Sequence, residues 1–302
     1  DGLYAYRPGK TQGNNYSERM KAWGLLLDKK GQPAITRIDH IYDLSGSGGG
    51  PIQKDKLWFF VSGRSQVPVN TVPNTFYNNG TQGEDDNYIR QSAVRLTYQV
   101  SPKHKIGAYY ERVYKWRGHD MSANTDPETG GRVWTSPDYS TKSIKYTGTL
   151  SSKLLVEGGY SANTEYYWNL MQGERSNPPV AQIQNLRLPV DAAYNASTMN
   201  DTFYTRNISH SATGGYLNGS LSNTFRNFPI SQVLQGSVSY VTGTHSIKAG
   251  LTLMHSWRYT TQEPNNSATL SVRGTQPFSV TQYATPIQFR ETLNYNMGWY
   301  AQ

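Results

Sequence analysis

The sequence has no cysteine and no long apolar run, and each absence removes a class of protein. Without cysteine there can be no disulfide, no thiolate nucleophile and no thiolate metal ligand. No stretch approaches the roughly 18 to 20 consecutive apolar residues that a membrane-spanning helix needs, which excludes a helical membrane protein. Only 36% of the 302 residues are hydrophobic, and the mean hydropathy is -0.68. In a membrane β-barrel only alternate residues face lipid, so this low average fits a barrel as well as a soluble protein.

Clustered basic charge is also missing, although the net charge is +8. The 29 Lys and Arg residues are scattered, and the longest basic run is Lys29-Lys30. A surface that follows a phosphate backbone normally gathers its basic residues in a patch or stripe. We therefore expect no nucleic acid as a partner.

Motifs for enzymes and cofactors are absent as well. No serine lies in a G-x-S-x-G elbow, and the six histidines show neither H-x-H nor H-E-x-x-H spacing. The Gly9-Lys10-Thr11 segment fails as a phosphate-binding loop because the earlier glycine position holds Tyr4. We expect no catalytic residue, no metal site, no cofactor and no enzymatic activity.

Aromatic residues and glycine are abundant instead, with 23 Tyr, 7 Trp, 8 Phe and 28 Gly, a mixture that favours strands and turns. The commonest local pattern is alternation of period two, which places one set of side chains on each face of a strand. In residues 90–101, Val94, Leu96 and Tyr98 share one face, and Arg95 and Thr97 share the other. The same pattern recurs at residues 105–114, 143–150, 154–162, 232–240 and 247–253. Short polar turns at residues 101–104, 151–153 and 241–245 join these segments, which predicts three antiparallel hairpins.

Long polar connectors separate one predicted hairpin from the next. They are rich in Asn, Gly, Pro and Thr and cover residues 66–87, 117–139, 169–231 and 260–285. Bacterial outer-membrane barrels alternate short periplasmic turns with long extracellular loops in this way, and aromatic residues mark the membrane interfaces. The pattern favours an all-β fold, an antiparallel transmembrane β-barrel.

Two other classes remain open on the residues alone. The first is a secreted, soluble β-sandwich or adhesin-like module that binds glycans through exposed aromatic residues. The second is a secreted hydrolase with paired carboxylates, although the sequence marks no such pair. Solubility without detergent would favour the first, and activity on polysaccharides or esters would favour the second.

The segment at residues 43–64 resembles an early barrel hairpin of TonB-dependent outer-membrane receptors. The specific likeness is to the large, Oar-like receptors that carry a carboxypeptidase-regulatory-like domain at the N-terminus. The residues that carry it are Gly49, Gly50, Pro51, Lys54, Asp55, Lys56, Leu57, Trp58, Phe59 and Phe60. We expect the glycines to allow a tight reversal, Pro51 to end strand pairing, and residues 57–61 to enter the membrane.

The resemblance implies a role and a larger parent protein. Related receptors have a 22-stranded barrel closed by a plug, whereas 302 residues supply about ten to twelve strands. The sequence contains no recognisable secretion signal, N-terminal domain, plug domain or TonB box. We therefore expect residues 1–302 to form about half of such a barrel, located in a bacterial outer membrane and in contact with its lipid.

The resemblance also implies the import of a bulky nutrient, namely a siderophore, a glycan or a peptide. The energy would come from a TonB complex acting through the plug. Substrate recognition would lie in the long extracellular loops, where aromatic and polar side chains offer stacking and hydrogen bonds. The predicted substrate contacts are Trp116, Arg117, Trp134, Tyr167 and Trp168.

Overall fold

The computed structural model of the protein consists almost entirely of β-strands. It describes residues 2–8, 17–22, 27, 31, 33–77, 79–122, 127, 132–171, 207–210, 216–218, 223–264, 268–273, 276–284 and 287–302. The one helix in this part of the chain, α1 (Glu18–Ala22), has five residues. Within the same residues, no helix is long enough and apolar enough to cross a membrane.

The strands differ widely in length, and those of the main sheet are mostly long. They are β1 (Gly2–Pro8), β2 (Ile38–Gln53), β3 (Leu57–Phe76), β4 (Gln82–Asp86), β5 (Tyr88–Ser101), β6 (His104–Asp120), β7 (Arg132–Thr149), β8 (Leu154–Met171), β9 (Asn207–His210), β10 (Tyr216–Asn218), β11 (Asn223–Thr242), β12 (His245–Pro264), β13 (Ala268–Arg273), β14 (Gln276–Gln282) and β15 (Ile287–Ala301).

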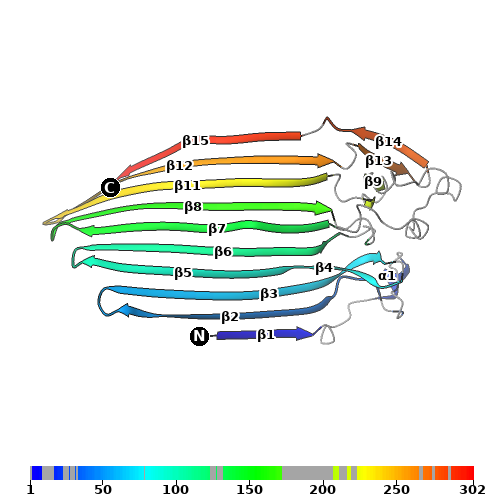
Figure 1. Ribbon diagram of the computed structural model, residues 1–302, viewed down its shortest axis with the longest axis horizontal. Helices are drawn as coiled ribbons and strands as arrows, with labels where there is room; N and C mark the ends of the chain where they lie inside the picture. The colour runs from blue at the N-terminus through cyan, green and yellow to red at the C-terminus, as the bar shows by residue number, and fades with distance from the viewer. Residues whose placement is uncertain are drawn as a thin grey trace.

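Eleven of these strands form one antiparallel sheet (Figure 1). Its order is β1-β2-β3-β5-β6-β7-β8-β11-β12-β15, and β4 pairs with β3 beside this path. A second sheet has the order β10-β9-β13-β14 and contains a parallel pair, β9 with β13. The prediction of an antiparallel all-β fold is confirmed. The main sheet also has a strand number within the range that the sequence predicts.

Short turns lie at one end of the main sheet and long connections at the other (Figure 1). β2 turns into β3 at residues 54–56, where Asp55 has a φ of 57° and the Lys56 amide donates to the Gln53 carbonyl at 3.1 Å. β11 turns into β12 at residues 243–244, where Gly243 has a φ of 53°. The hairpins predicted from alternation, β5–β6, β7–β8 and β11–β12, are all present.

The apolar positions of successive strands lie in register and form one continuous face, here called the apolar face. One row of directly paired residues crosses eight strands: Phe59, Leu96, Ala108, Ile144, Tyr160, Leu234, Leu253 and Met297. Ile144 is 51% exposed, Leu234 is 54% exposed and Met297 is 63% exposed. The alternation predicted in single strands is therefore a property of the whole sheet.

The opposite face, here called the polar face, is held by cross-strand hydrogen bonds and ion pairs. One row contains Glu111, Thr141, Asn163, Ser231 and Ser256. Thr141 donates to Asn163 at 3.2 Å, and the hydroxyls of Ser231 and Ser256 are 2.9 Å apart. In the half of the sheet nearer the short turns, Glu157 pairs with Lys145 at 2.9 Å and with Lys248 at 3.7 Å.

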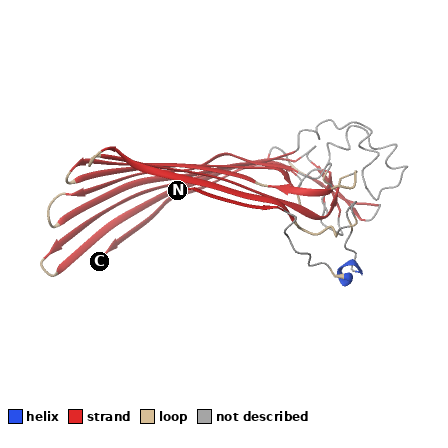
Figure 2. Cartoon of the chain, turned by 90° about the horizontal axis from the view of Figure 1, so that it is seen from below, coloured by secondary structure: helices blue, strands red, loops and turns tan. Residues whose placement is uncertain are grey.

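Buried apolar side chains in the described part of the chain lie mainly at the end with the long connections. They are Ala34, Val67, Val69, Val72 and Met121. Val67, Val69 and Val72 lie in the half of β3 that extends away from its short turn, and Val69 pairs with Asp86 of β4. Figure 2 shows the main sheet as a single curved layer of strands. Among the described residues, the body of the sheet therefore has no covered core of the kind found between two packed layers.

The long loops are shorter than the sequence predicts, because strands continue into them. β3 runs on to Phe76, β6 to Asp120 and β8 to Met171, while β7 begins at Arg132 and β11 at Asn223. In the last connector, β12 runs on to Pro264, and β13 and β14 follow. The prediction of irregular loops is wrong at these positions. Backbone pairing needs no apolar side chains, so the strands extend beyond the point at which alternation ends.

The glycine run has a different role from the one predicted. Residues 46–50 pair within β2, and the reversal follows at residues 54–56. Pro51 still pairs with Trp58, so it does not end the pairing, and a register shift follows it. A Cβ atom on Gly49 would lie 2.7 Å from the Phe59 carbonyl oxygen and 3.1 Å from the Phe60 ring. Gly49 thus permits close packing against β3 rather than the turn itself.

Candidate functional site

All five predicted substrate contacts lie in strands of the main sheet, so the prediction that they lie in loops is wrong. Trp116 and Arg117 belong to β6, Trp134 belongs to β7, and Tyr167 and Trp168 belong to β8. All five lie near the end of the sheet that carries the long connections. The structure distributes them among three sets of contacts, and Arg117 pairs directly with Trp134 across β6 and β7.

Trp134 and Tyr167 meet on the polar face, together with two residues that sequence reasoning missed. The rings of Trp134 and Tyr167 stack with centroids 5.8 Å apart and an interplanar angle of 21°. Tyr139 meets both rings edge-on, with centroids 5.9 Å from Trp134 and 6.3 Å from Tyr167. The Lys115 ammonium lies 4.8 Å from the centroid of the Trp134 ring. We call these four residues the aromatic–lysine cluster.

Register places the aromatic–lysine cluster on the polar face. Tyr139 lies two residues before Thr141 and pairs with Glu165, which receives a 2.7 Å hydrogen bond from Asn163. Lys115 lies four residues after Glu111 in the same strand, so both side chains point to one face. The cluster was missed because Lys115 and Tyr139 come from strands that only the fold brings together.

A groove of about 450 Å³ lies beside the cluster on the same face. Its polar lining comes from Asn163, Glu165, Ser231, Ser256, Arg258 and Glu291. Arg258 and Glu291 form an ion pair at 2.7 Å across β12 and β15. Because Glu165 lines the groove and pairs with Tyr139, the groove adjoins the aromatic–lysine cluster. Together they offer flat rings for stacking and both signs of charge for hydrogen bonding.

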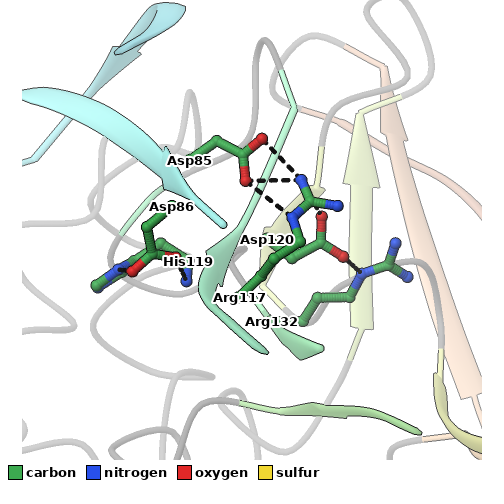
Figure 3. Close-up of polar contacts among 6 residues, drawn as sticks. All are labelled: Asp85, Asp86, Arg117, His119, Asp120 and Arg132. Atoms are coloured by element: carbon green, nitrogen blue, oxygen red, sulfur yellow. Dashed lines mark hydrogen bonds and ion pairs between the residues drawn. The ribbon is translucent and has the colours of Figure 1, made fainter. Parts of the chain in front are cut away.

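Arg117 belongs to an ion-pair network that ties β4, β6 and β7 together (Figure 3). Its Nη2 atom lies 2.6 and 2.7 Å from the two carboxylate oxygens of Asp85 and 2.8 Å from Asp120. Asp120 also accepts from Arg132 Nε at 2.6 Å and is only 8% exposed. Nε of Arg117 also donates to Asp85 Oδ1 at 3.1 Å, so ion pairs engage both Nη2 and Nε, and a structural role accounts for this residue.

His119 and Asp86 form a second link in the same region (Figure 3). The His119 amide donates to Asp86 Oδ1 at 2.7 Å, and Nδ1 of His119 lies 3.1 Å from Oδ2. The hydrogen bond to Asp86 raises the pKa of His119. Burial acts to raise the pKa of Asp86, but hydrogen bonds from His119 hold it below its ordinary value. For Asp85, burial outweighs the Arg117 contacts and raises the pKa.

Carboxylates and histidines are numerous here, but they do not converge on a single point. Among the described residues, no three such side chains are placed to share a metal ion. The carboxylates of Asp85 and Asp120 point to guanidinium groups and that of Asp86 to His119, as Figure 3 shows. The arrangement therefore consists of ion pairs that link β4, β6 and β7.

Trp168 and Trp116 lie at positions that continue the apolar face. Trp168 contacts Phe228 with ring centroids 6.5 Å apart, and the Arg226 guanidinium lies 5.7 Å from its centroid. Phe228 also contacts Tyr166 at 5.1 Å and Tyr259 at 6.0 Å, which continues the aromatic row across β8, β11 and β12. Trp116 contacts Tyr88 at 5.1 Å. Aromatic rows at this position are typical of the interfacial girdle of a membrane barrel.

Comparisons with known proteins point to the fold. No protein-family model matches the chain, and no curated protein sequence matches it. In structure the chain is similar to the outer membrane transporter YddB from Escherichia coli, with a TM-score of 0.53 and 9% sequence identity. The match covers 100% of this chain and 36% of that one, so the chain spans well under two thirds of its structural neighbour. The fold of this chain is an antiparallel all-β sheet that is similar in structure to part of that protein.

Proposed function

We propose that the chain is the membrane-embedded barrel part of a bacterial outer-membrane transporter that imports a bulky nutrient. The observation that supports this proposal is the apolar face, which runs in register from β3 to β15 and has exposed apolar side chains in every strand that it crosses. Transfer of apolar surface out of water is favourable by about 25 cal/mol per Å², so a face of this size requires a cover. Hydrocarbon is the cover that a single curved sheet can use.

The same face argues against the soluble β-sandwich. A sandwich buries one face of each sheet against the other at a spacing of about 10 Å. In the described part of the chain, the second sheet has only four short strands, β9, β10, β13 and β14, which lie at one end (Figure 1). It is too small to cover the row from Phe59 to Met297.

The edges of the main sheet add a requirement. Among the described residues, β1 pairs only with β2 and β15 only with β12. Unpaired backbone groups are not tolerated in hydrocarbon, where each costs several kcal/mol. Under this proposal, further strands pair with β1 and β15 and close the barrel.

The proposed substrate class comes from the resemblance to TonB-dependent receptors, and the polar face supplies the proposed contacts. The proposed substrate is a siderophore, a glycan or a peptide, and the energy comes from a TonB complex acting through a plug. The aromatic–lysine cluster and the adjoining groove are the proposed contacts, so Trp134 and Tyr167 remain candidates together with Lys115 and Tyr139. No residue is assigned a catalytic role, and the proposed activity is transport alone.

Site-directed spin labelling tests the membrane placement directly, because the sequence has no cysteine to remove. Single cysteines replace Leu234 or Leu251 on the apolar face and Gln235 or Thr252 on the polar face, in protein expressed from its complete reading frame. After reconstitution in vesicles, labels at 234 and 251 are expected to collide with oxygen and to be shielded from a water-soluble nickel chelate. Labels at 235 and 252 serve as matched neighbours and are expected to lack oxygen contact. Equal access of the chelate to all four labels would rule out the proposal.

A further inference from the structure

Three cations lie on the apolar side of β5, β6 and β7, nearer the long connections than Val94, Tyr110 and Ile144. Arg90 continues the alternation of Val94, Arg112 that of Tyr110, and Lys142 that of Ile144. Each cation therefore points to the same side of the sheet as the apolar residue whose alternation it continues.

Register brings these cations close together. Lys142 pairs with Tyr110, which is two residues from Arg112, and Arg90 pairs with Tyr114, which is also two residues from Arg112. Diagonal neighbours of this kind are about 7 to 8 Å apart. The three cations thus form one diagonal across the three strands. Tyr110 and Tyr114 lie on either side of Arg112 along β6. We call Arg90, Tyr110, Arg112, Tyr114 and Lys142 the basic patch.

The basic patch carries more positive than negative charge. Among residues 88–92, 112–116 and 138–142, all of which the structure describes, the only acidic side chain on this side is Asp138, which pairs with Arg112 at 2.6 Å. Arg90 and Lys142 are exposed, and no carboxylate in the described part of the chain pairs with either. Tyr110 and Tyr114 are also exposed. Two cations that no described carboxylate pairs with, and two exposed tyrosines, therefore lie on this side of the sheet.

We propose that the basic patch binds the phosphate group of a membrane lipid in the extracellular leaflet. This inference rests on the proposed function, because it requires the apolar face to be in hydrocarbon. Lysine and arginine stems lie along apolar surface while their charged ends reach the headgroup layer, which is where these positions fall. Phosphate oxygens match both the guanidinium and the ammonium, and the tyrosine hydroxyls can donate further hydrogen bonds.

A lipid is the occupant that the position favours over a soluble anion. The patch lies on the apolar side of the sheet and adjoins Val94 and Ile144, the second of which is 51% exposed. A ligand with a phosphate joined to acyl chains satisfies both the cations and this apolar surface at once. The salt-screened attraction of a free phosphate lacks the second contribution.

The test measures lipid retained by the protein, expressed from its complete reading frame and reconstituted in phosphatidylcholine nanodiscs with a rising fraction of phosphatidic acid. Native mass spectrometry after mild detergent release counts bound phosphatidic acid. The test variant is Arg90→Gln with Lys142→Gln, and it leaves the Arg112–Asp138 pair intact. Each cation near an anionic surface accounts for about a fivefold effect, so the double variant is expected to retain this lipid about 25-fold less tightly.

Two control variants separate the patch from charge and folding effects. Arg95→Gln with Lys105→Gln removes one arginine and one lysine from the polar face of β5 and β6 and is expected to retain the lipid like the wild type. Arg90→Lys with Lys142→Arg keeps both charges and is also expected to retain it. Equal retention by wild type and the test variant, or an equal loss in the polar-face control, would overturn the inference alone. Protein that does not enter nanodiscs at all would instead overturn the proposed function on which the inference depends.

Discussion

At the scale of single residues, the face on which an aromatic side chain lies separates two roles that look alike in the sequence. Trp134 and Trp168 both lie near the end of a long strand, and each has a cation over its ring. Trp134 stacks on Tyr167 on the polar face, whereas Trp168 meets Phe228 on the apolar side. Under the proposed function, only Trp134 lies on the face that contacts the substrate.

We therefore predict that Trp134→Ala weakens substrate binding about tenfold, in line with the loss of one buried aromatic contact at a binding site. Trp168→Ala is the matched control and is expected to leave binding unchanged. Titration of the purified protein with a ferric hydroxamate siderophore, a linear oligosaccharide and a nonapeptide, followed by calorimetry, measures the effect on whichever probe binds the wild type. Equal losses in the two variants would show that the facing of these rings does not decide their roles.

The His119–Asp86 link gives a pH dependence with a definite sign. His119 has a raised pKa in the folded protein, so its contribution is complete below its unfolded value of about 6.5 and is lost as pH rises through the folded pKa. Asp86 has a lowered pKa, so its contribution is complete above its unfolded value of about 3.9 and is lost as pH falls through the folded pKa. The link is therefore strongest between about pH 4 and pH 6.5.

Hydrogen exchange at residues 82–86, corrected for the intrinsic pH dependence of exchange, measures this window. Protection is expected to fall when the pH is raised from 6 to 9, and His119→Gln is expected to abolish that fall. Residues 234–238 of β11 provide an internal reference that should not respond. A fall of the same size in the His119→Gln variant would assign the effect to another group.

At the scale of elements, the alternation of side chains was sufficient to predict the hairpins but not the full length of the strands. In β5, the pattern of Val94, Leu96 and Tyr98 is clear because only one of its faces is apolar. Toward the end with the long connections both faces are polar, as at the end of β6, where Gly118, His119 and Asp120 follow Arg117. Nothing in the order of such residues distinguishes a paired strand from a loop, so the extension appears only in the fold.

The candidate site was predictable to a similar degree. Aromatic residues near strand ends identified Trp134 and Tyr167, but their contact with Lys115 and Tyr139 depends on the pairing of β6, β7 and β8. The pairing contains register shifts between Val113 and Trp116 and between Thr135 and Asp138. Such shifts change which side chains meet, and no local sequence signal records them.

The β2–β3 hairpin offers a test of close strand packing. A side chain at Gly49 would lie 2.7 Å from the Phe59 carbonyl oxygen, so Gly49→Ala is expected to lower the free energy of unfolding by about 1 to 3 kcal/mol. Gly48→Ala is the control, because a Cβ atom there meets nothing within 4 Å. Urea unfolding in lipid vesicles, followed by tryptophan fluorescence, compares the two variants. A destabilisation at Gly48 equal to that at Gly49 would contradict the packing argument.

At the scale of the whole molecule, the two faces of the main sheet carry different kinds of side chain. The apolar face carries exposed Ile144, Leu234 and Met297, and the polar face carries the ion pairs of Glu157 and Arg258. A soluble protein of this length would bury its apolar residues in a common interior. Here the exposed apolar residues are distributed along the whole sheet, so the stability of the fold depends on its surroundings as well as on its own contacts.

This dependence predicts opposite outcomes for two neighbouring substitutions in β11, a strand paired on both sides. Leu234→Arg places a charge on the apolar face and is expected to destabilise the protein in vesicles by about 2 to 4 kcal/mol, the cost of arginine near the middle of a bilayer. Gln235→Arg adds the same side chain to the polar face and is expected to change stability by less than about 1 kcal/mol. Reversible folding into phosphatidylcholine vesicles, monitored by gel mobility without heating, gives both values. If the effects were reversed, the apolar face would lie in water, and the sheet would be oriented opposite to the transport proposal.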